Sequence, residues 1–111
     1  MVEDGWQVAD ALKRSLERLE MRVVGPAATS AEARQLASNI VLHLAIVDVN
    51  LNGEMAYALL DWLHSRGTPV VVTSGYEDLP ESLATFAAIL RKPFTAAALE
   101  HTLRQVVKLP P

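Results

Sequence analysis

Short apolar runs alternate with segments of helical periodicity along the 111-residue chain, and this alternation constrains the fold more than any other feature. The runs at 43–49 and 69–73 are continuous and rich in β-branched residues, which is typical of strands buried on both faces of a parallel sheet. The segments between such runs carry apolar residues at helical spacing, which predicts amphipathic helices. The pattern therefore predicts one α/β domain over 1–111, with a parallel sheet and helices on both of its faces.

The boundaries of the expected elements follow from apolar spacing and from cap and turn residues. Helices are expected at 6–20, 31–39, 53–65, 78–86 and 95–107, and strands at 22–28, 43–49, 69–73 and 88–90. Ser30 and Thr95 are the expected N-caps, because their hydroxyls can accept hydrogen bonds from amides of the first helical turn. Arg66 and Gly67 are expected to end the third helix, since glycine tolerates the left-handed conformation common there.

The first strand is expected to be truncated. Only residues 1–4 precede the first helix, whereas an ordinary strand has about five or six residues. The first strand is central in a doubly wound sheet, so a stub exposes the edges of its neighbours to pairing with another chain. One expectation is therefore a homodimer that forms through an exposed sheet edge.

Composition and charge exclude several classes of protein. The chain has no cysteine, which excludes a disulfide framework and a thiolate metal site. Its net charge of −3 argues against nucleic acid as the main partner. No apolar run approaches the roughly 20 residues that span a bilayer, and the first residues do not read as a signal peptide. We therefore expect a soluble protein in the cytoplasm.

Aromatic and histidine side chains give no separate functional signal. Trp6 and Trp62 lie on predicted helices and are expected to be packing residues. The three histidines, His43, His64 and His101, lack the spacing of metal ligands and are expected to be structural or exposed.

Polar side chains stand where four of the predicted strands end. They are Glu3 with Asp4, Asp48, Thr73 with Ser74, and Lys92. Right-handed crossovers bring the C-terminal ends of parallel strands to one rim of the sheet, so these side chains should converge. Three carboxylates at such short distances repel one another, so they can all remain ionised only if a cation lies beside them. Mg²⁺ prefers carboxylate oxygens as ligands. The arrangement predicts a divalent metal site at this rim.

Asp48 follows a buried apolar run and precedes a polar, glycine-bearing loop, a position suited to chemistry. A carboxylate can act as a nucleophile in phosphoryl transfer by forming an acyl phosphate. The ammonium of Lys92 would offset charge on the phosphoryl group, and the Thr73 hydroxyl could donate a hydrogen bond to it. Each residue alone has a plainer explanation as a cap, a strand former or a solvated lysine. Their occurrence together at successive strand ends favours the functional interpretation.

In order along the chain, these motifs resemble the receiver domain of two-component response regulators. The motifs are Val2-Glu3-Asp4, Asp48-Val49-Asn50, Thr73-Ser74-Gly75 and Lys92-Pro93-Phe94, and the resemblance runs from Val2 to Val107. It implies a flavodoxin-like, doubly wound sheet of five parallel strands in the order 2-1-3-4-5. It also implies a cis Lys92–Pro93 bond, which the small trans preference of X-Pro bonds allows. The stretch 72–76 is similar to an alphaproteobacterial-type subgroup with a Thr-Gly-Tyr signature.

The resemblance also implies a function. Asp48 would be the phosphoacceptor for a histidine kinase or a histidine phosphotransfer protein, with Mg²⁺ as the cofactor. The implied metal ligands are Glu3, Asp4, Asp48 and the main-chain carbonyl of Asn50. Thr73 would be the switch hydroxyl, and Lys92 would pair with the phosphoryl group. The domain would be a signalling switch rather than an enzyme, without an output domain of its own and with a downstream protein as its target.

A second function stays open. Ile89 stands where many receivers carry a Tyr or Phe that rotates when the switch hydroxyl moves. With the short first strand, this difference favours the alternative of a pseudo-receiver, a phosphorylation-independent protein-interaction module. A flavodoxin-like cofactor binder is disfavoured, because no phosphate loop rich in Gly, Ser and Thr follows the first strand.

Overall fold

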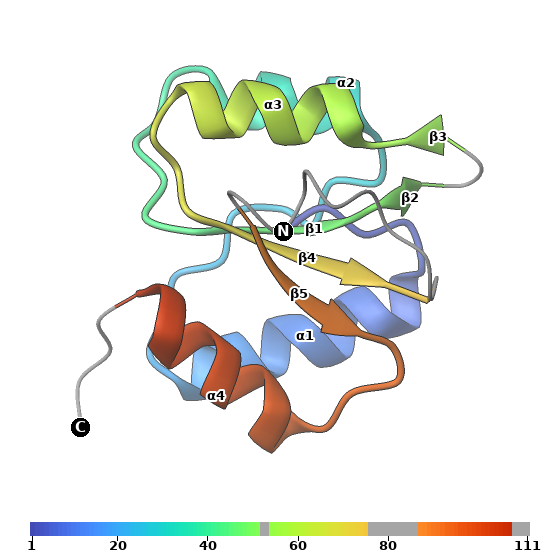
Figure 1. Ribbon diagram of the computed structural model, residues 1–111, viewed down its shortest axis with the longest axis vertical. Helices are drawn as coiled ribbons and strands as arrows, with labels where there is room; N and C mark the ends of the chain where they lie inside the picture. Colours follow the sequence, from blue (N-terminus) through green and yellow to red (C-terminus); the bar gives the residue numbers. More distant parts are fainter. Residues whose placement is uncertain (52–53, 76–86, 108–111) are drawn as a thin grey trace.

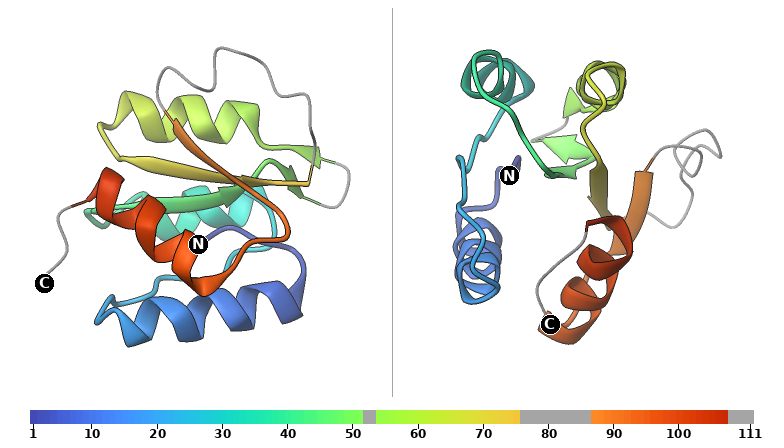
Figure 2. Two further views of the ribbon diagram at one scale, coloured as in Figure 1. Left: turned by 60° about the horizontal axis from the view of Figure 1, so that its bottom comes forward. Right: turned by 90° about the vertical axis from the view of Figure 1, so that its left-hand side faces the viewer.

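The computed structural model describes residues 1–51, 54–75 and 87–107. In chain order the elements are α1 (Trp6–Arg18), α2 (Ser30–Ala37), β1 (Ala45–Asp48), β2 (Asn50–Leu51), β3 (Glu54–Met55), α3 (Tyr57–Ser65), β4 (Val70–Ser74), β5 (Ala87–Arg91) and α4 (Ala96–Val106). Helices α2 and α3 cover one face of the central sheet, and α1 and α4 cover the other (Figures 1 and 2). The predicted α/β architecture, a parallel sheet between two layers of helices, is confirmed. The helix expected at 78–86 lies outside the described residues.

Strands β1, β4 and β5 form a parallel sheet in the order β1-β4-β5. Successive residues of a strand point to opposite faces, and the continuous apolar runs therefore supply both layers of the core. Ile46 and Val71 pack with the leucines of α1 and α4. Val47 and Val72 pack on the other face, against the leucines of α3. The strands expected at 43–49, 69–73 and 88–90 are thus present, because β-branched and apolar runs of this kind fit a sheet buried on both faces.

The N-terminal segment pairs with the chain through one residue, Val2, which has a bridge partner on each side. Val2 forms parallel bridges to Ala27 and to Val47. Its amide donates to the Ile46 carbonyl at 2.8 Å, and its carbonyl accepts from the Asp48 amide at 2.9 Å. Of the strand expected at 22–28, only the bridge at Ala27 is formed. A five-stranded order with a truncated first strand stays a prediction, since the regular sheet of the described residues has three strands.

Side-chain caps begin two of the helices. The Thr95 hydroxyl accepts from the Ala98 amide at 3.0 Å, which confirms this residue as the N-cap of α4. At α2 the N-cap is Thr29, whose hydroxyl accepts from the Glu32 amide at 3.1 Å. The expectation of Ser30 as the cap was wrong by one residue, because Thr29 has the extended backbone that a cap needs while Ser30 is already helical.

Helix α3 begins later than expected and ends as expected. It starts at Tyr57 rather than near 53, because β3 pairs antiparallel with β2 and holds the chain extended. At the other end, Gly67 has a φ of +75° and its amide donates to the His64 carbonyl. The Thr68 amide then donates to the Leu63 carbonyl at 3.1 Å. These two bonds complete the glycine-terminated helix end.

Leucines at helical spacing form most of the buried faces of α1, α3 and α4. Leu12 and Leu16 of α1, and Leu99 and Leu103 of α4, are buried in one cluster. Trp6 is 76% exposed, so the expectation that it packs was wrong. Trp62 is half-buried between two guanidinium groups, with Arg34 at 5.5 Å and Arg66 at 4.6 Å from its ring centroid. These cation–π contacts connect α2 to the end of α3.

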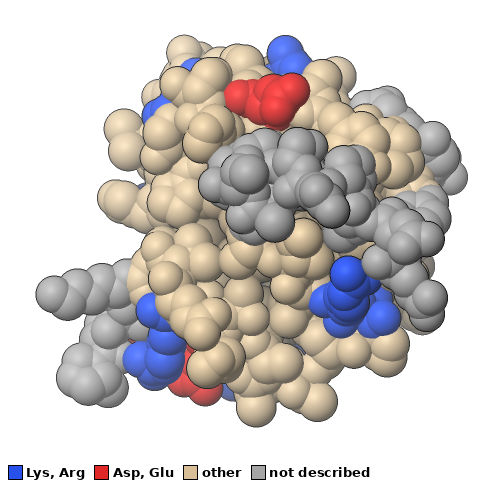
Figure 3. Space-filling model, viewed as in Figure 1, with Lys and Arg blue, Asp and Glu red and all other residues tan. Residues whose placement is uncertain are grey.

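On the face shown in Figure 3, basic and acidic side chains lie in small separate groups rather than in one continuous patch. None of the described helices combines the length and the apolar character that crossing a bilayer requires.

Candidate functional site

Three carboxylates meet at the rim where the strands end. Glu3, Asp4 and Asp48 each offer an oxygen, and these oxygens lie within 4.8 Å of one another. The backbone explains this, because the Asp48 amide donates to the Val2 carbonyl and so brings Glu3 beside the end of β1. Glu3 and Asp48 are buried, whereas Asp4 is exposed. The predicted convergence of these side chains is therefore present in the structure.

Lys92 bridges the two buried carboxylates. Its Nζ lies 2.7 Å from Glu3 Oε1 and 2.9 Å from Asp48 Oδ2. The Lys92 amide donates to the Ser74 carbonyl at 2.7 Å, which fixes the lysine at the ends of β4 and β5. The bond from Lys92 to Pro93 is cis, as expected. The ammonium thus supplies positive charge between Glu3 and Asp48.

Burial and hydrogen bonding shift the pKa values of Glu3 and Lys92 in opposite directions. Burial raises the pKa of Glu3, and the hydrogen bonds from Lys92 and from the Gly5 amide offset part of that rise. Burial would lower the pKa of Lys92, but its hydrogen bonds to Glu3 and Asp48 outweigh burial and leave that pKa raised. The lysine is therefore held as a cation by the two carboxylates.

Gly5 completes the contacts of Glu3 and was not singled out from the sequence. Its amide donates to Glu3 Oε2 at 3.0 Å, while Oε1 accepts from Lys92. Each oxygen of this buried carboxylate thus has a partner. The available sequence signal was a glycine two residues after the acid and directly before a helix, where the amides of the first turn are free.

The other predicted residues surround Asp48. The Asn50 amide donates to Asp48 Oδ1 at 3.2 Å, so one carboxylate oxygen faces Asn50 and the other faces Lys92. Thr73 is the residue paired with Asp48 in the sheet register and is 1% exposed. Ile89 lies one register position away on β5 and packs, half-buried, against the cluster on the α3 face. Tyr76, the last residue of the stretch 72–76 that is similar to the Thr-Gly-Tyr signature, lies outside the described residues.

The donor atoms at this rim fit a hard divalent cation. The set consists of carboxylate oxygens, which Mg²⁺ prefers to nitrogen or sulfur. Two of the three carboxylates, Glu3 and Asp48, are held in place by hydrogen bonds, and the exposed Asp4 leaves the cluster accessible from solvent. These three carboxylates are therefore the candidate ligands of a metal ion at this rim.

A parallel sheet between two helical layers, with three acids and a lysine at the strand ends, defines a doubly wound α/β domain whose candidate site lies at the carboxyl ends of the strands. Residues 1–104 match the family described as the response regulator receiver domain, and the chain belongs to that family. Receiver domains belong to two-component signalling and are signalling domains rather than classical enzymes. They generally bind Mg²⁺ at an acidic cluster and interact with kinase or phosphotransfer partners.

Several solved structures are similar to this chain over nearly its whole length. SdrG from Sphingomonas melonis Fr1 is 32% identical, with a TM-score of 0.82 over 95% of this chain and 91% of that chain. A CheY-like receiver domain from Methanospirillum hungatei JF-1 is 28% identical, with a TM-score of 0.81 over 94% and 87%. The REC domain of the response regulator PhyR from Erythrobacter litoralis, at 21% identity, supports the fold alone, with a TM-score of 0.82 over 100% and 92%. The comparison with curated proteins gives no match.

Proposed function

We propose that this receiver domain is a phosphoacceptor, which takes a phosphoryl group from a histidine kinase or a histidine phosphotransfer protein onto Asp48 with Mg²⁺. The observation that carries the proposal is the contact of the Lys92 ammonium with Asp48 at 2.9 Å, beside the three-carboxylate cluster. A buried acid with a cation beside it is suited to accept a phosphoryl group, because positive charge offsets the charge that is transferred.

In the proposed reaction, an oxygen of Asp48 attacks the phosphorus of a phosphohistidine. A P–O bond forms to the carboxylate and the P–N bond breaks, and the imidazole leaves and takes a proton from solvent. The Asn50 amide orients Asp48 for the attack through its bond to Oδ1. The Lys92 ammonium moves from the carboxylate to a phosphoryl oxygen, and the Thr73 hydroxyl donates to another.

The proposed ligands of Mg²⁺ are the carboxylates of Glu3, Asp4 and Asp48 and the main-chain carbonyl of Asn50. When bound, the metal neutralises charge on the transferred phosphoryl group. Because Lys92 already contacts two of these carboxylates, we expect it to release Glu3 when the metal is bound. The proposal includes a cytoplasmic location and a downstream protein that recognises the phosphorylated form.

Incubation with acetyl phosphate and Mg²⁺, followed by intact mass measurement, tests the proposal. The wild-type protein should gain one phosphoryl group, and Asp48→Asn should gain none. Asp61→Asn is the matched control, because Asp61 is an exposed carboxylate on α3, away from the strand ends. No adduct on the wild-type protein with either acetyl phosphate or beryllofluoride would contradict the proposal, as would an equal adduct on Asp48→Asn.

A pseudo-receiver is the second candidate function. Two observations favour it. Ile89 packs, half-buried, against the core where a rotating aromatic would stand, and Lys92 contacts both buried acids. Isothermal titration with Mg²⁺ separates the two functions. If the double variant Glu3→Gln/Asp4→Asn binds Mg²⁺ as well as the wild-type protein does, the pseudo-receiver is favoured.

A further inference from the structure

Two arginines from different helices lie over one indole ring in the layer formed by α2 and α3. The guanidinium carbon of Arg34, on α2, is 5.5 Å from the centroid of the Trp62 ring, and that of Arg66, at the end of α3, is 4.6 Å from it. Both arginines are exposed, and Trp62 is half-buried. Two like charges are thus held at one place on the surface although they repel each other.

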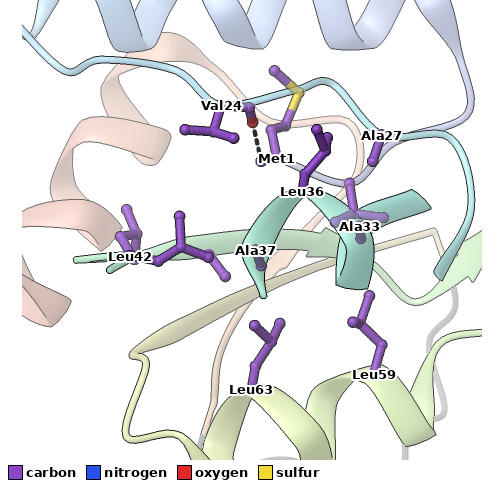
Figure 4. A pocket seen from close by; sticks show the side chains of 12 residues that line it. Met1, Val24, Ala27, Ala33, Leu36, Ala37, Leu42, Leu59 and Leu63 are labelled. Atoms are coloured by element: carbon purple, nitrogen blue, oxygen red, sulfur yellow. Dashed lines mark hydrogen bonds between the residues drawn. The ribbon is translucent and has the colours of Figure 1, made fainter. Parts of the chain in front are cut away.

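The packing of α2 on α3 fixes the positions of these two arginines. Figure 4 shows Leu59 and Leu63 of α3 pointing toward α2, where the buried Ala37 lies. The Nη2 of Arg66 donates to the Ala37 carbonyl at 3.1 Å, which connects this guanidinium to the end of α2. The separation of Arg34 and Arg66 is therefore set by the packing of the two helices as well as by the indole.

The charge of the two arginines is not balanced within the part of the chain that the structure describes. Neither arginine forms an ion pair there, and the nearby acids on the same helices, Glu32 and Asp61, pair with neither of them. Arg34 makes only the ring contact, and Arg66 adds one hydrogen bond. Because a guanidinium has five N–H donors in a planar fork, both groups can still bind a carboxylate.

Contact with the ring favours binding of an anion by these side chains. A free arginine loses much rotamer freedom when a ligand fixes it, and Trp62 has already restricted both arginines. Both guanidinium carbons lie within 5.5 Å of the ring centroid. Side chains one turn apart on a helix start about 5–6 Å from each other. A segment with two acidic residues at that spacing can therefore place one carboxylate at each guanidinium.

We propose that the surface formed by Arg34, Trp62 and Arg66 binds an acidic segment of a partner protein. Charge complementarity identifies the occupant, because both groups with open donors are cations and carboxylates match their planar forks. A nucleic acid is disfavoured, since the chain as a whole carries a net charge of −3 and would repel an extended polyanion.

This surface lies away from Asp48. Arg66 precedes β4 and therefore lies at the N-terminal ends of the parallel strands, whereas Asp48 is the last residue of β1 at their C-terminal ends. A segment bound at Arg66 leaves Asp48 accessible. The proposed surface therefore goes beyond the phosphoacceptor function and does not depend on it.

Fluorescence anisotropy tests the proposal with a fluorescein-labelled helical peptide that carries two glutamates four residues apart, at low ionic strength. The wild-type protein and Asp48→Asn should bind the peptide equally. Arg34→Gln should raise the dissociation constant about tenfold, because one charge-assisted contact is lost. Arg14→Gln is the matched control, since it removes the same charge from an exposed arginine on α1, in the other helical layer, and it should bind as the wild type does. A wild-type protein that does not bind overturns the proposal, as does equal weakening by both variants.

Two changes to the probe define the ligand. A peptide with glutamine at both glutamate positions should bind about tenfold more weakly or less tightly still. A labelled single-stranded DNA of similar length should also bind more weakly than the acidic peptide at the same salt concentration. Equal binding of the glutamine peptide overturns the charge pairing, and equal binding of the DNA overturns the acidic protein segment as the occupant.

Variants that keep both charges test the part played by geometry. Arg34→Lys retains the charge but loses the planar fork, and it should weaken binding severalfold. Trp62→Phe should retain most of the binding, whereas Trp62→Leu should weaken it about tenfold because the aromatic platform is lost. Circular dichroism at the titration temperature checks that each variant is folded, and Arg34→Lys, at an exposed position, provides the test if Trp62→Leu is not. Wild-type affinity in Arg34→Lys or in folded Trp62→Leu overturns the proposed geometry.

Discussion

Replacement of Lys92 by methionine tests the electrostatic design of the site. Lys92→Met keeps much of the side-chain volume and removes the charge that lies 2.7 Å from Glu3 and 2.9 Å from Asp48. The two carboxylates are 3% and 8% exposed, so each would be left buried without its cation. Breaking a buried ion pair from one side typically costs about 3–5 kcal/mol. Lys92 is itself 26% exposed, and we therefore expect the lower end, about 3 kcal/mol.

Urea denaturation with EDTA and with Mg²⁺ measures this effect. In EDTA the variant should unfold at a clearly lower urea concentration than the wild-type protein, with an unchanged slope. Mg²⁺ should stabilise the variant more than the wild type, because the metal restores positive charge beside Glu3 and Asp48. Lys13→Met is the control, since Lys13 on α1 forms no ion pair among the described residues, and it should change stability little.

The double variant Lys92→Met/Asp48→Asn separates charge repulsion from lost packing. If repulsion between Glu3 and Asp48 causes the loss, removing one of the two charges should recover part of the stability of Lys92→Met. The reasoning is refuted if Lys92→Met in EDTA stays within about 0.5 kcal/mol of the wild-type protein, the range typical of ordinary surface substitutions.

Three further predictions concern the scaffold. Leu103→Ala should lower the free energy of unfolding by about 2–5 kcal/mol, because Leu103 is fully buried between α4 and the sheet. A loss below about 1 kcal/mol in a urea titration would contradict that packing. Thr29→Ala should cost about 1 kcal/mol of unfolding free energy, because the Thr29 hydroxyl caps α2, and the neighbouring Ser30→Ala should cost much less. Equal losses in the two variants would show that the cap is wrongly assigned. Arg66→Gln should lower the thermal unfolding midpoint by a few degrees, because it removes a cation–π contact with Trp62 and the hydrogen bond to the Ala37 carbonyl at 3.1 Å. An unchanged midpoint in calorimetry would show that this link between α2 and α3 does not contribute to stability.

The parts of the fold that sequence predicts well are those with a local physical cause. The strand of 69–73 appears because a β-branched run fits a sheet buried on both faces, and Gly67 ends a helix because it adopts a positive φ. The predicted start of α3 was too early. The residues of β3 that precede the helix are extended because they pair with β2, and local sequence patterns do not show such a pairing. Trp6 was expected to pack because it is a large apolar residue on a predicted helix, but it stands at the first position of α1 and off the face that carries the buried Ala9, Leu12 and Leu16.

The site was predicted by topology rather than by spacing. Parallel strands bring Glu3, Asp48 and Lys92 to one rim whatever the residues between them, so their convergence followed from the strand order. The contacts of Lys92 with both Glu3 and Asp48 could not be predicted from the sequence. That depends on side-chain length and on the Gly5 amide, which takes the second oxygen of Glu3. The predicted roles of Thr73 and Asn50 rest on the family resemblance and stay predictions.

The contact between Lys92 and Glu3 also has a consequence for the order of folding. The two residues are separated by 89 positions, so their ion pair closes a loop that contains most of the chain. Closing such a loop carries an entropic cost that local helices do not have. During synthesis Glu3 emerges first, yet its cation is added only after β4 and β5 are made. The ion pairs at the strand ends therefore form only when the domain is nearly complete, and a chain that ends before Lys92 lacks the cation that contacts Glu3 and Asp48.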